Sequence, residues 1–288
     1  MGECMEISQT MISVEALLPL VQRREVKMLD ASWYLPAEAR NPYEEFLAAR
    51  IPGSRFFDIE GIADQSHACP HMLPSAEQFA EQMEALGVGS EDQVVIYDGK
   101  GLFSAPRGWW MFRVFGHSRV RILSGGLPAW LSAGFETESG DDFASAASVR
   151  FRAEYQREWV ADKQRVQSAV DIGDALIVDA RSPGRFAGEE EEPRPGVRPG
   201  HIPGSRNLHY ASVLEAGGLN LKAQAELQTL TADLSVDQAD AIITTCGSGI
   251  SACLLALALH EIGYSPVAVY DGSWAEWGSD PSCSVQKG

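Results

Sequence analysis

The sequence of 288 residues predicts an α/β protein of two tandem domains, each with a mainly parallel sheet and helices on both faces. Two observations support this class. Short apolar, β-rich segments alternate with amphipathic helix-like segments, and one set of motifs occurs twice, about 150 residues apart. A period of that length is too long for a solenoid repeat and matches the size of an ordinary domain.

The repeated motifs fix the extent of the two halves. MLDAS at 28–32 matches IVDAR at 177–181, IPGSR at 51–55 recurs at 202–206, VVIYDG at 94–99 matches AIITTCG at 241–247, and matching stretches end at Trp130 and Trp277. Between them, 136–150 is acidic, rich in Ser, Ala and Gly, and without apolar period, which is typical of a linker. We therefore expect a first domain at 1–138, a linker at 139–150 and a second domain at 151–288.

The individual elements follow in chain order. Strands are expected at 26–32, 93–99 and 119–125, and again at 175–181, 241–247 and 266–272. In the first half, 76–86 places Phe79, Met83 and Leu86 at helical spacing. In the second half, 249–262 is expected to be a helix. In such folds ligands bind at the carboxyl ends of the strands, so the functional site is expected there.

Composition excludes several classes of function. The net charge of −17 argues against nucleic acid or an anionic membrane surface as a partner. The longest apolar run, at 250–259, falls well short of the roughly 18 residues that a membrane helix needs. The N-terminal MGECMEISQT has no basic residue, unlike a signal peptide, and we expect a cytoplasmic location.

The cysteines of the chain also fit a reducing, cytoplasmic compartment. The 5 cysteines, at 4, 69, 246, 253 and 283, lack CxxC or Cys/His ligand spacing, so neither a disulfide framework nor a metal site is expected.

Cys246 is the predicted nucleophile. It follows the apolar run AIITT and precedes a predicted helix, where converging backbone N–H groups and the helix dipole favour a thiolate. Gly247 and Gly249 allow the loop to curl around an anion. The first half has Asp98 at the position of Cys246, so it cannot perform thiol chemistry. Cys253, on the following helix, is expected to fill the core.

The chain resembles the tandem-domain rhodanese-like sulfurtransferases over nearly its whole length. The motifs that carry the resemblance are LDA near the start, the two IPG elements, FSAPRGWWMFRVFG at 103–116, EPRPGVRPGHIPG at 192–204, CGSGIS at 246–251 and YDGSWAEWG at 270–278. The resemblance implies two rhodanese-like domains, with a catalytic cysteine in the second and a silent first domain. It also implies sulfur transfer from 3-mercaptopyruvate.

The loop after Cys246 bears on the choice of substrate. Thiosulfate-using members resemble CRKGV here, with basic side chains facing a dianion, whereas Gly247 and Ser248 add no charge. Related phosphatases need an arginine after five intervening residues to bind phosphate, and Ala252 stands there. The loop residues Gly247, Gly249, Ile250 and Ser251 are expected to bind the substrate.

The resemblance assigns the substrate carboxylate to two arginines, Arg185 and Arg194. Arginine pairs with carboxylates through two parallel hydrogen bonds, which suits this role. The alternative is that these arginines pair only with the acidic run Glu189 to Glu192. Arg198 is a weaker third candidate.

A proton relay is also implied, from Ser248 through His71 to Glu60. Asp58 lies close enough in sequence to compete with Glu60. The alternative for His71 is a hydrogen-bonded residue of the domain interface.

The expected mechanism is double displacement. The Cys246 thiolate takes the sulfur of 3-mercaptopyruvate, pyruvate leaves, and the persulfide passes its outer sulfur to an acceptor thiol, such as a thioredoxin-like protein, or to cyanide. No metal or organic cofactor is required. Two alternatives remain open: a thiosulfate:cyanide sulfurtransferase, and a non-catalytic persulfide carrier or regulatory module.

Overall fold

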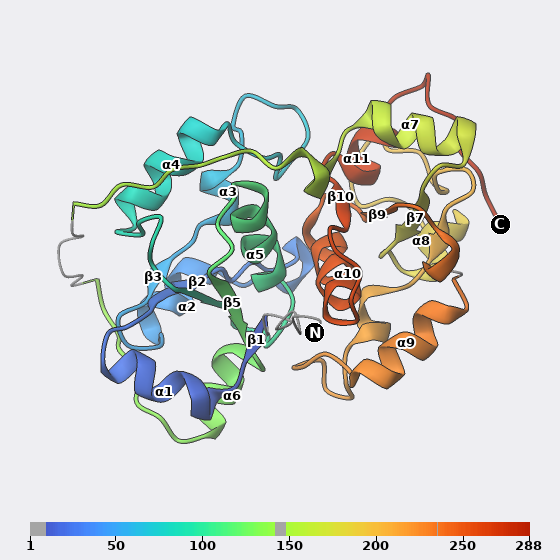
Figure 1. Cartoon of the computed structure of the whole chain (residues 1–288). Coiled ribbons are helices and arrows are strands. Elements are labelled where there is room, and N and C mark those ends of the chain that lie inside the picture. The colour runs from blue at the N-terminus through green and yellow to red at the C-terminus, as the bar shows by residue number, and fades with distance from the viewer. Residues whose placement is uncertain (1–9, 142–147, 235) are drawn as a thin grey trace, which may run out of the picture.

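The computed structural model describes residues 10–141, 148–234 and 236–288. It contains two five-stranded parallel sheets, one in each half of the chain, with helices packed around them (Figure 1). The predicted α/β class, with a parallel sheet in each half, is confirmed.

The first sheet has the strand order β1-β5-β4-β2-β3. Its strands are β1 (Met11–Ile12), β2 (Lys27–Asp30), β3 (Arg55–Phe56), β4 (Val94–Tyr97) and β5 (Val120–Leu123). The helices around it are α1 (Val14–Gln22), α2 (Pro42–Ala48), α3 (Ile59–Ile62), α4 (Ala76–Ala85), α5 (Ala105–Val114) and α6 (Gly126–Ser132).

The second sheet repeats the same arrangement, in the order β6-β10-β9-β7-β8. Its strands are β6 (Val160–Ala161), β7 (Leu176–Asp179), β8 (Arg206–Asn207), β9 (Ile242–Thr245) and β10 (Ala268–Tyr270). The helices are α7 (Lys163–Ile172), α8 (Pro183–Ala187), α9 (Gln224–Ala232), α10 (Ile250–Glu261) and α11 (Ser273–Trp277). The internal repeat read from the sequence is therefore a repeat of topology.

The repeated IPGSR motif builds the same turn in each half. Ser54 donates its backbone N–H to the Ile51 carbonyl at 3.1 Å, and Ser205 donates to Ile202 at 3.0 Å. Each turn leads directly into a two-residue edge strand, β3 or β8. The sequence did not predict the four two-residue strands, because a segment so short carries no measurable alternation.

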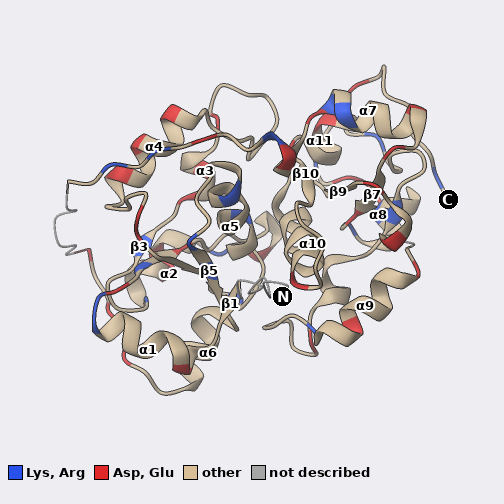
Figure 2. Cartoon of the chain, in the orientation of Figure 1, with Lys and Arg blue, Asp and Glu red and all other residues tan. Residues whose placement is uncertain are grey.

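The two halves meet through α5 and α10, which pack against each other (Figure 1). Nearly every residue of both helices is buried, and α10 is apolar on all sides, as expected of a helix covered on every face. In Figure 2 most of the α10 ribbon is tan, the colour of residues other than Lys, Arg, Asp and Glu. The catalytic loop predicted from the sequence immediately precedes this buried helix.

Residues 151–154, which follow the predicted linker, still pack against the first domain. Residues 142–147 of that linker lie outside the described residues. Phe151 is buried beside Phe79 and Phe112, and Glu154 donates its N–H to the Phe115 carbonyl at 3.0 Å. The chain therefore reaches the second domain just before β6.

Candidate active site around Cys246

Cys246 lies at the carboxyl end of β9, in the tight turn that begins α10. Its Sγ accepts the backbone N–H of Gly249 at 3.2 Å, and its own N–H donates to the Ser273 hydroxyl at 3.3 Å. The side chain is 1% exposed. An N–H at the positive end of a twelve-residue helix favours negative charge on the sulfur.

The start of α11 holds the loop from the other side. Trp274 donates its N–H to the Cys246 carbonyl at 2.9 Å, and Ala275 donates to the Gly247 carbonyl at 3.0 Å. The carbonyls of Cys246 and Gly247 are therefore turned towards α11.

The two loop glycines differ in how closely their neighbours confine them. Gly249 has φ +82°, and a Cβ there would lie 2.9 Å from Arg107 Nη1. A Cβ on Gly247 would lie 3.2 Å from Arg185 Nη2. The residues that follow, Ile250 and Ser251, form the first turn of α10, and Ile250 is buried.

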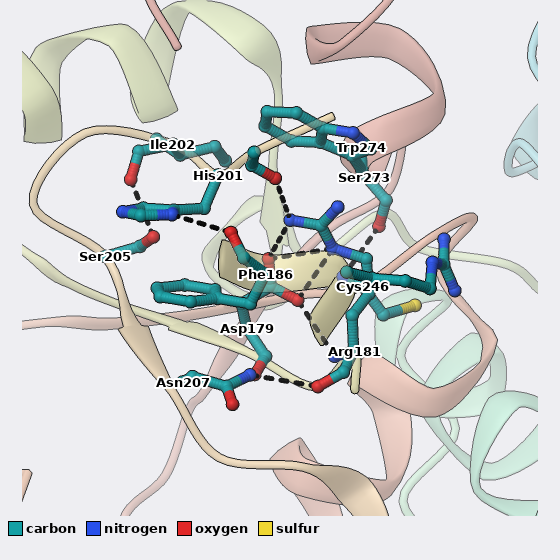
Figure 3. A network of polar contacts seen from close by, with 12 residues as sticks. Asp179, Arg181, Phe186, His201, Ile202, Ser205, Asn207, Cys246, Ser273 and Trp274 are labelled. Atoms are coloured by element: carbon teal, nitrogen blue, oxygen red, sulfur yellow. Dashed lines mark hydrogen bonds and ion pairs between the residues drawn. The ribbon is translucent and has the colours of Figure 1, made fainter. Parts of the chain in front are cut away.

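Arg185 lies against Gly247 and is held there by Glu192. Its Nη2 and Nε both donate to the Glu192 carboxylate, which is 3% exposed and also accepts from Arg181 Nη1 at 2.8 Å. Arg181 is bound in turn to Asp179, at 2.7 Å (Figure 3). The pairing of Arg185 with the acidic run, expected as the alternative, is therefore present, and Arg185 Nη1 makes no hydrogen bond to the described residues.

Arg194 lies in a different setting. It lines a pocket of about 370 Å3, together with Cys69 and Pro70 of the first domain and Ala275 of α11. Within the described residues its side chain forms no ion pair or hydrogen bond, so the guanidinium is available to an anion. Arg198, in contrast, donates to the carbonyls of Trp277, Gly278, Asp280 and Cys283, which makes its role structural.

The proposed relay residues meet at the domain interface, but not as the sequence suggested. His71 Nδ1 lies 3.1 Å from the Ser248 carbonyl and must carry a proton to bond there, because a carbonyl only accepts. Its Nε2 lies 3.6 Å from Glu60 Oε1. The Ser248 hydroxyl forms no hydrogen bond with the described residues, so His71 contacts this loop through the main chain.

Glu60 is the carboxylate that approaches His71. It accepts from Trp33 Nε1 at 2.8 Å, and the contacts with His71 and Trp33 lower its pKa to about 2. Asp58 instead accepts the backbone N–H of Glu60 and caps α3.

Sequence reasoning missed the residue that ties these groups together, Arg107. Its side chain is fully buried and binds Asp271 at 2.8 Å, the Gly249 carbonyl at 3.4 Å and the His71 carbonyl. The motif FSAPRGWWMFRVFG contained it, but only its place beside α10 shows what it contacts.

Cys253 packs in the core as expected. Its Sγ donates to the Gly249 carbonyl at 3.1 Å, and burial raises its pKa to about 12.

Among residues 10–141, 148–234 and 236–288, no three His, Cys, Asp or Glu side chains gather as a metal site would require. In the same residues no helix is both long and apolar enough to cross a membrane.

Comparisons with known proteins match this arrangement. The family model described as a rhodanese-like domain matches residues 20–133 and, again, 162–280. Thiosulfate/3-mercaptopyruvate sulfurtransferase 1, mitochondrial, of Arabidopsis thaliana is 41% identical, covering 97% of this chain and 78% of its own. The 3-mercaptopyruvate sulfurtransferase of Homo sapiens is 42% identical, covering 91% and 88%. The crystal structure of SseA from Escherichia coli, a 3-mercaptopyruvate sulfotransferase with the "rhodanese" fold, superimposes with a TM-score of 0.84 at 36% identity, covering 93% of this chain and 99% of SseA.

Proposed function

The chain belongs to the rhodanese-like family and carries its domain twice, and from that premise we propose that it is a 3-mercaptopyruvate sulfurtransferase. In this proposal it transfers the substrate's sulfur to a thiol or cyanide and releases pyruvate. The observation that carries the proposal is the Cys246 loop, where Sγ accepts an N–H at the start of α10 beside Arg185.

The first half-reaction forms a persulfide. The Cys246 thiolate attacks the sulfur of 3-mercaptopyruvate, and the carbon–sulfur bond breaks with its electron pair going to carbon. The resulting enolate of pyruvate is protonated at carbon. The loop N–H groups stabilise the negative charge on the bound sulfur, in a site shielded from water.

The two arginines have different parts in this proposal. Arg194 is free to receive the substrate carboxylate, while Glu192 fixes Arg185 so that Nη1 remains as its free donor beside Gly247. The carboxylate is then bound between a donor that Glu192 holds and the unpaired guanidinium of Arg194.

Proton handling falls to Ser248 and the His71–Glu60 pair. The Ser248 hydroxyl is free to exchange a proton with the substrate thiol. His71, held by Glu60, fixes the carbonyl of Ser248 and with it the direction of that hydroxyl.

In the second half-reaction an acceptor thiolate attacks the outer sulfur and regenerates the Cys246 thiolate, or cyanide takes the sulfur to give thiocyanate. The acceptor must reach a nearly covered sulfur, so a small molecule or a projecting thiol, as on a thioredoxin-like protein, fits best. The cytoplasmic location stays a prediction.

Thiosulfate is a second candidate donor. The Arabidopsis relative, at 41% identity, is named for thiosulfate as well as 3-mercaptopyruvate. The uncharged loop at Gly247 and Ser248 favours the monoanion, so we expect a higher kcat/KM for 3-mercaptopyruvate.

Intact mass after mixing with 3-mercaptopyruvate tests the proposal. One added sulfur atom on the Cys246 peptide, pyruvate in a coupled assay and ping-pong kinetics are expected. Cys246→Ser is the control and should show none of these. Absence of pyruvate from the folded wild-type protein would contradict the proposal and leave the persulfide carrier as the alternative.

A further inference from the structure

In the first domain, the position that corresponds to Cys246 is occupied by a carboxylate that binds its own loop. Asp98 Oδ2 accepts the backbone N–H groups of Phe103, Ser104 and Ala105 at 2.7, 2.9 and 2.9 Å. Its Oδ1 accepts the N–H of Lys100 at 2.9 Å. The side chain is 1% exposed, so the loop N–H groups enclose an anion supplied by the chain itself.

The loop that Asp98 holds is hydrogen-bonded to Trp33. The Ser104 hydroxyl accepts the Trp33 backbone N–H at 3.0 Å. The Trp33 ring lies edge-on to His71, 5.1 Å between centroids, and its Nε1 donates to Glu60. Asp98 fixes the backbone of Ser104, so it is connected to both members of the His71–Glu60 pair.

Asp98 is also connected to Arg107, through the helix α5. Asp98 binds the N–H groups at the start of α5, and Arg107 lies in the first turn of that helix. Its guanidinium binds Asp271 and the carbonyls of His71 and Gly249. It therefore contacts the catalytic loop directly.

Both routes converge on His71. Its backbone is in the left-handed region, with φ +63°, which a non-glycine residue adopts only when its surroundings hold it. Arg107 binds its carbonyl, Trp33 packs on its ring, and Asp98 organises the backbone that carries both contacts.

We propose that Asp98 is a positioning residue of the second domain's active site, and that the degenerate loop of the first domain serves to hold His71 and Gly249 in place. Asp98 acts through Arg107 and Trp33 and touches no substrate. The kinetic test of this inference rests on the proposed function, whereas the effect of formate on Tm does not.

Asp98→Ala tests the proposal, because it removes a group of the size and charge of formate. We expect kcat with 3-mercaptopyruvate to fall about 10- to 100-fold, since small displacements of catalytic groups cost that much, with KM changed less. Formate at tens of millimolar should restore part of kcat and raise the Tm of this variant. Acetate should act less, because its methyl group collides with the alanine Cβ.

Matched variants separate this role from general damage. In Asp98→Asn no space is vacated, so formate should neither restore kcat nor raise Tm. Asp92→Ala removes a carboxylate at the opposite end of β4, where it accepts the Gly89 N–H, and should keep wild-type kcat. Arg107→Lys should lower kcat as Asp98→Ala does, without a response to formate.

Several outcomes would overturn the proposal. These are a folded Asp98→Ala protein with kcat within twofold of wild type, a loss of kcat without any formate effect on kcat or Tm, and an equal formate effect in Asp98→Asn. If Asp98→Ala does not fold, Asp98→Asn decides: a severalfold lower kcat at unchanged KM supports the proposal, and unchanged kcat refutes it. If the wild type releases no pyruvate, the proposed function fails, while the formate effect on Tm still tests the anion-filled loop.

Discussion

At the scale of single residues, Cys246 and Cys253 show how position decides the chemistry of a thiol. Both contact Gly249, but Cys246 accepts its N–H, whereas Cys253 donates to its carbonyl. An N–H donor stabilises a thiolate, and a carbonyl acceptor stabilises a thiol. Burial raises the pKa of Cys253 to about 12.

Cys246→Ser should therefore reduce pyruvate release to background, because a serine hydroxyl ionises far less readily and cannot hold a persulfide. Cys253→Ser should keep nearly full turnover, since a hydroxyl can donate the same bond. Steady-state pyruvate release measures both. Equal losses in the two variants, or substantial activity in Cys246→Ser, would show that the nucleophile is misassigned.

Arg185→Ala and Arg194→Ala should each cost on the order of 2–4 kcal/mol in kcat/KM for 3-mercaptopyruvate, roughly 30- to 1000-fold. Arg185→Ala also leaves the buried Glu192 with one partner, so it should lower Tm, whereas Arg194→Ala should not. Lysine should restore only part of the loss.

The control for the arginines is a sulfur donor without a carboxylate, for which the losses should be smaller. The double variant should cost less than the sum of the singles, because both arginines hold one group. Equal losses with both donors would assign them a role in ordering the loop instead.

At the scale of elements, the two strand-to-helix loops differ in what fills them. The silent loop is longer by three residues, from Asp98 to Ala105 against Cys246 to Ile250, and it encloses its own carboxylate. The catalytic loop is short, and Arg185 lies against it at Gly247. In the proposed function, this shorter loop receives the incoming anion.

Replacing Gly247 by Arg and Ser248 by Lys should raise the ratio of kcat/KM for thiosulfate over that for 3-mercaptopyruvate, because it adds positive charge where a dianion would lie. A side chain at Gly247 also displaces Arg185, whose Nη2 would be 3.2 Å from the new Cβ, so activity with 3-mercaptopyruvate should fall as well. An unchanged ratio in a folded variant would show that loop charge does not set specificity.

The sequence predicted those elements that carry a periodic pattern. Strands β2, β4, β5, β7, β9 and β10 and helices α4 and α10 lie within their expected segments. The two-residue edge strands β1, β3, β6 and β8 could not be predicted, because so short a segment shows no periodic pattern. The Cys246 loop could be read from its glycines and the following helix, whereas the roles of Glu192 and Arg107 depend on contacts between distant segments, which no local pattern encodes.

At the scale of the whole molecule, the interface between α5 and α10 joins the two domains. His260, near the end of α10, packs against Trp109 and Trp159 at 5.2 and 6.0 Å between centroids. Burial, with Arg113 nearby, lowers its pKa from 6.5 to about 4. The folded protein therefore holds this histidine neutral at pH values where the unfolded chain protonates it.

The interface should consequently weaken in acid. Because the pKa of His260 is lower in the folded state, its contribution to the free energy of unfolding is complete above pH 6.5. That contribution is lost progressively as the pH falls towards 4. His260→Leu should remove that component, on the order of 1–3 kcal/mol, so its Tm should fall less between pH 7 and 4 than that of wild type. His67→Gln, a change at an exposed histidine, should follow the wild-type curve. Parallel curves for His260→Leu and wild type would refute this.

The burial of α5 against α10 also constrains synthesis of the chain. The ribosome finishes α5 at Val114 and reaches α10 at Ile250, so α5 waits for its covering helix during roughly 7 to 30 s of translation at ~5–20 residues/s. Throughout that interval the nascent first domain presents an uncovered apolar face. We therefore expect the incomplete chain to be more prone to aggregation than the finished protein until α10 covers α5.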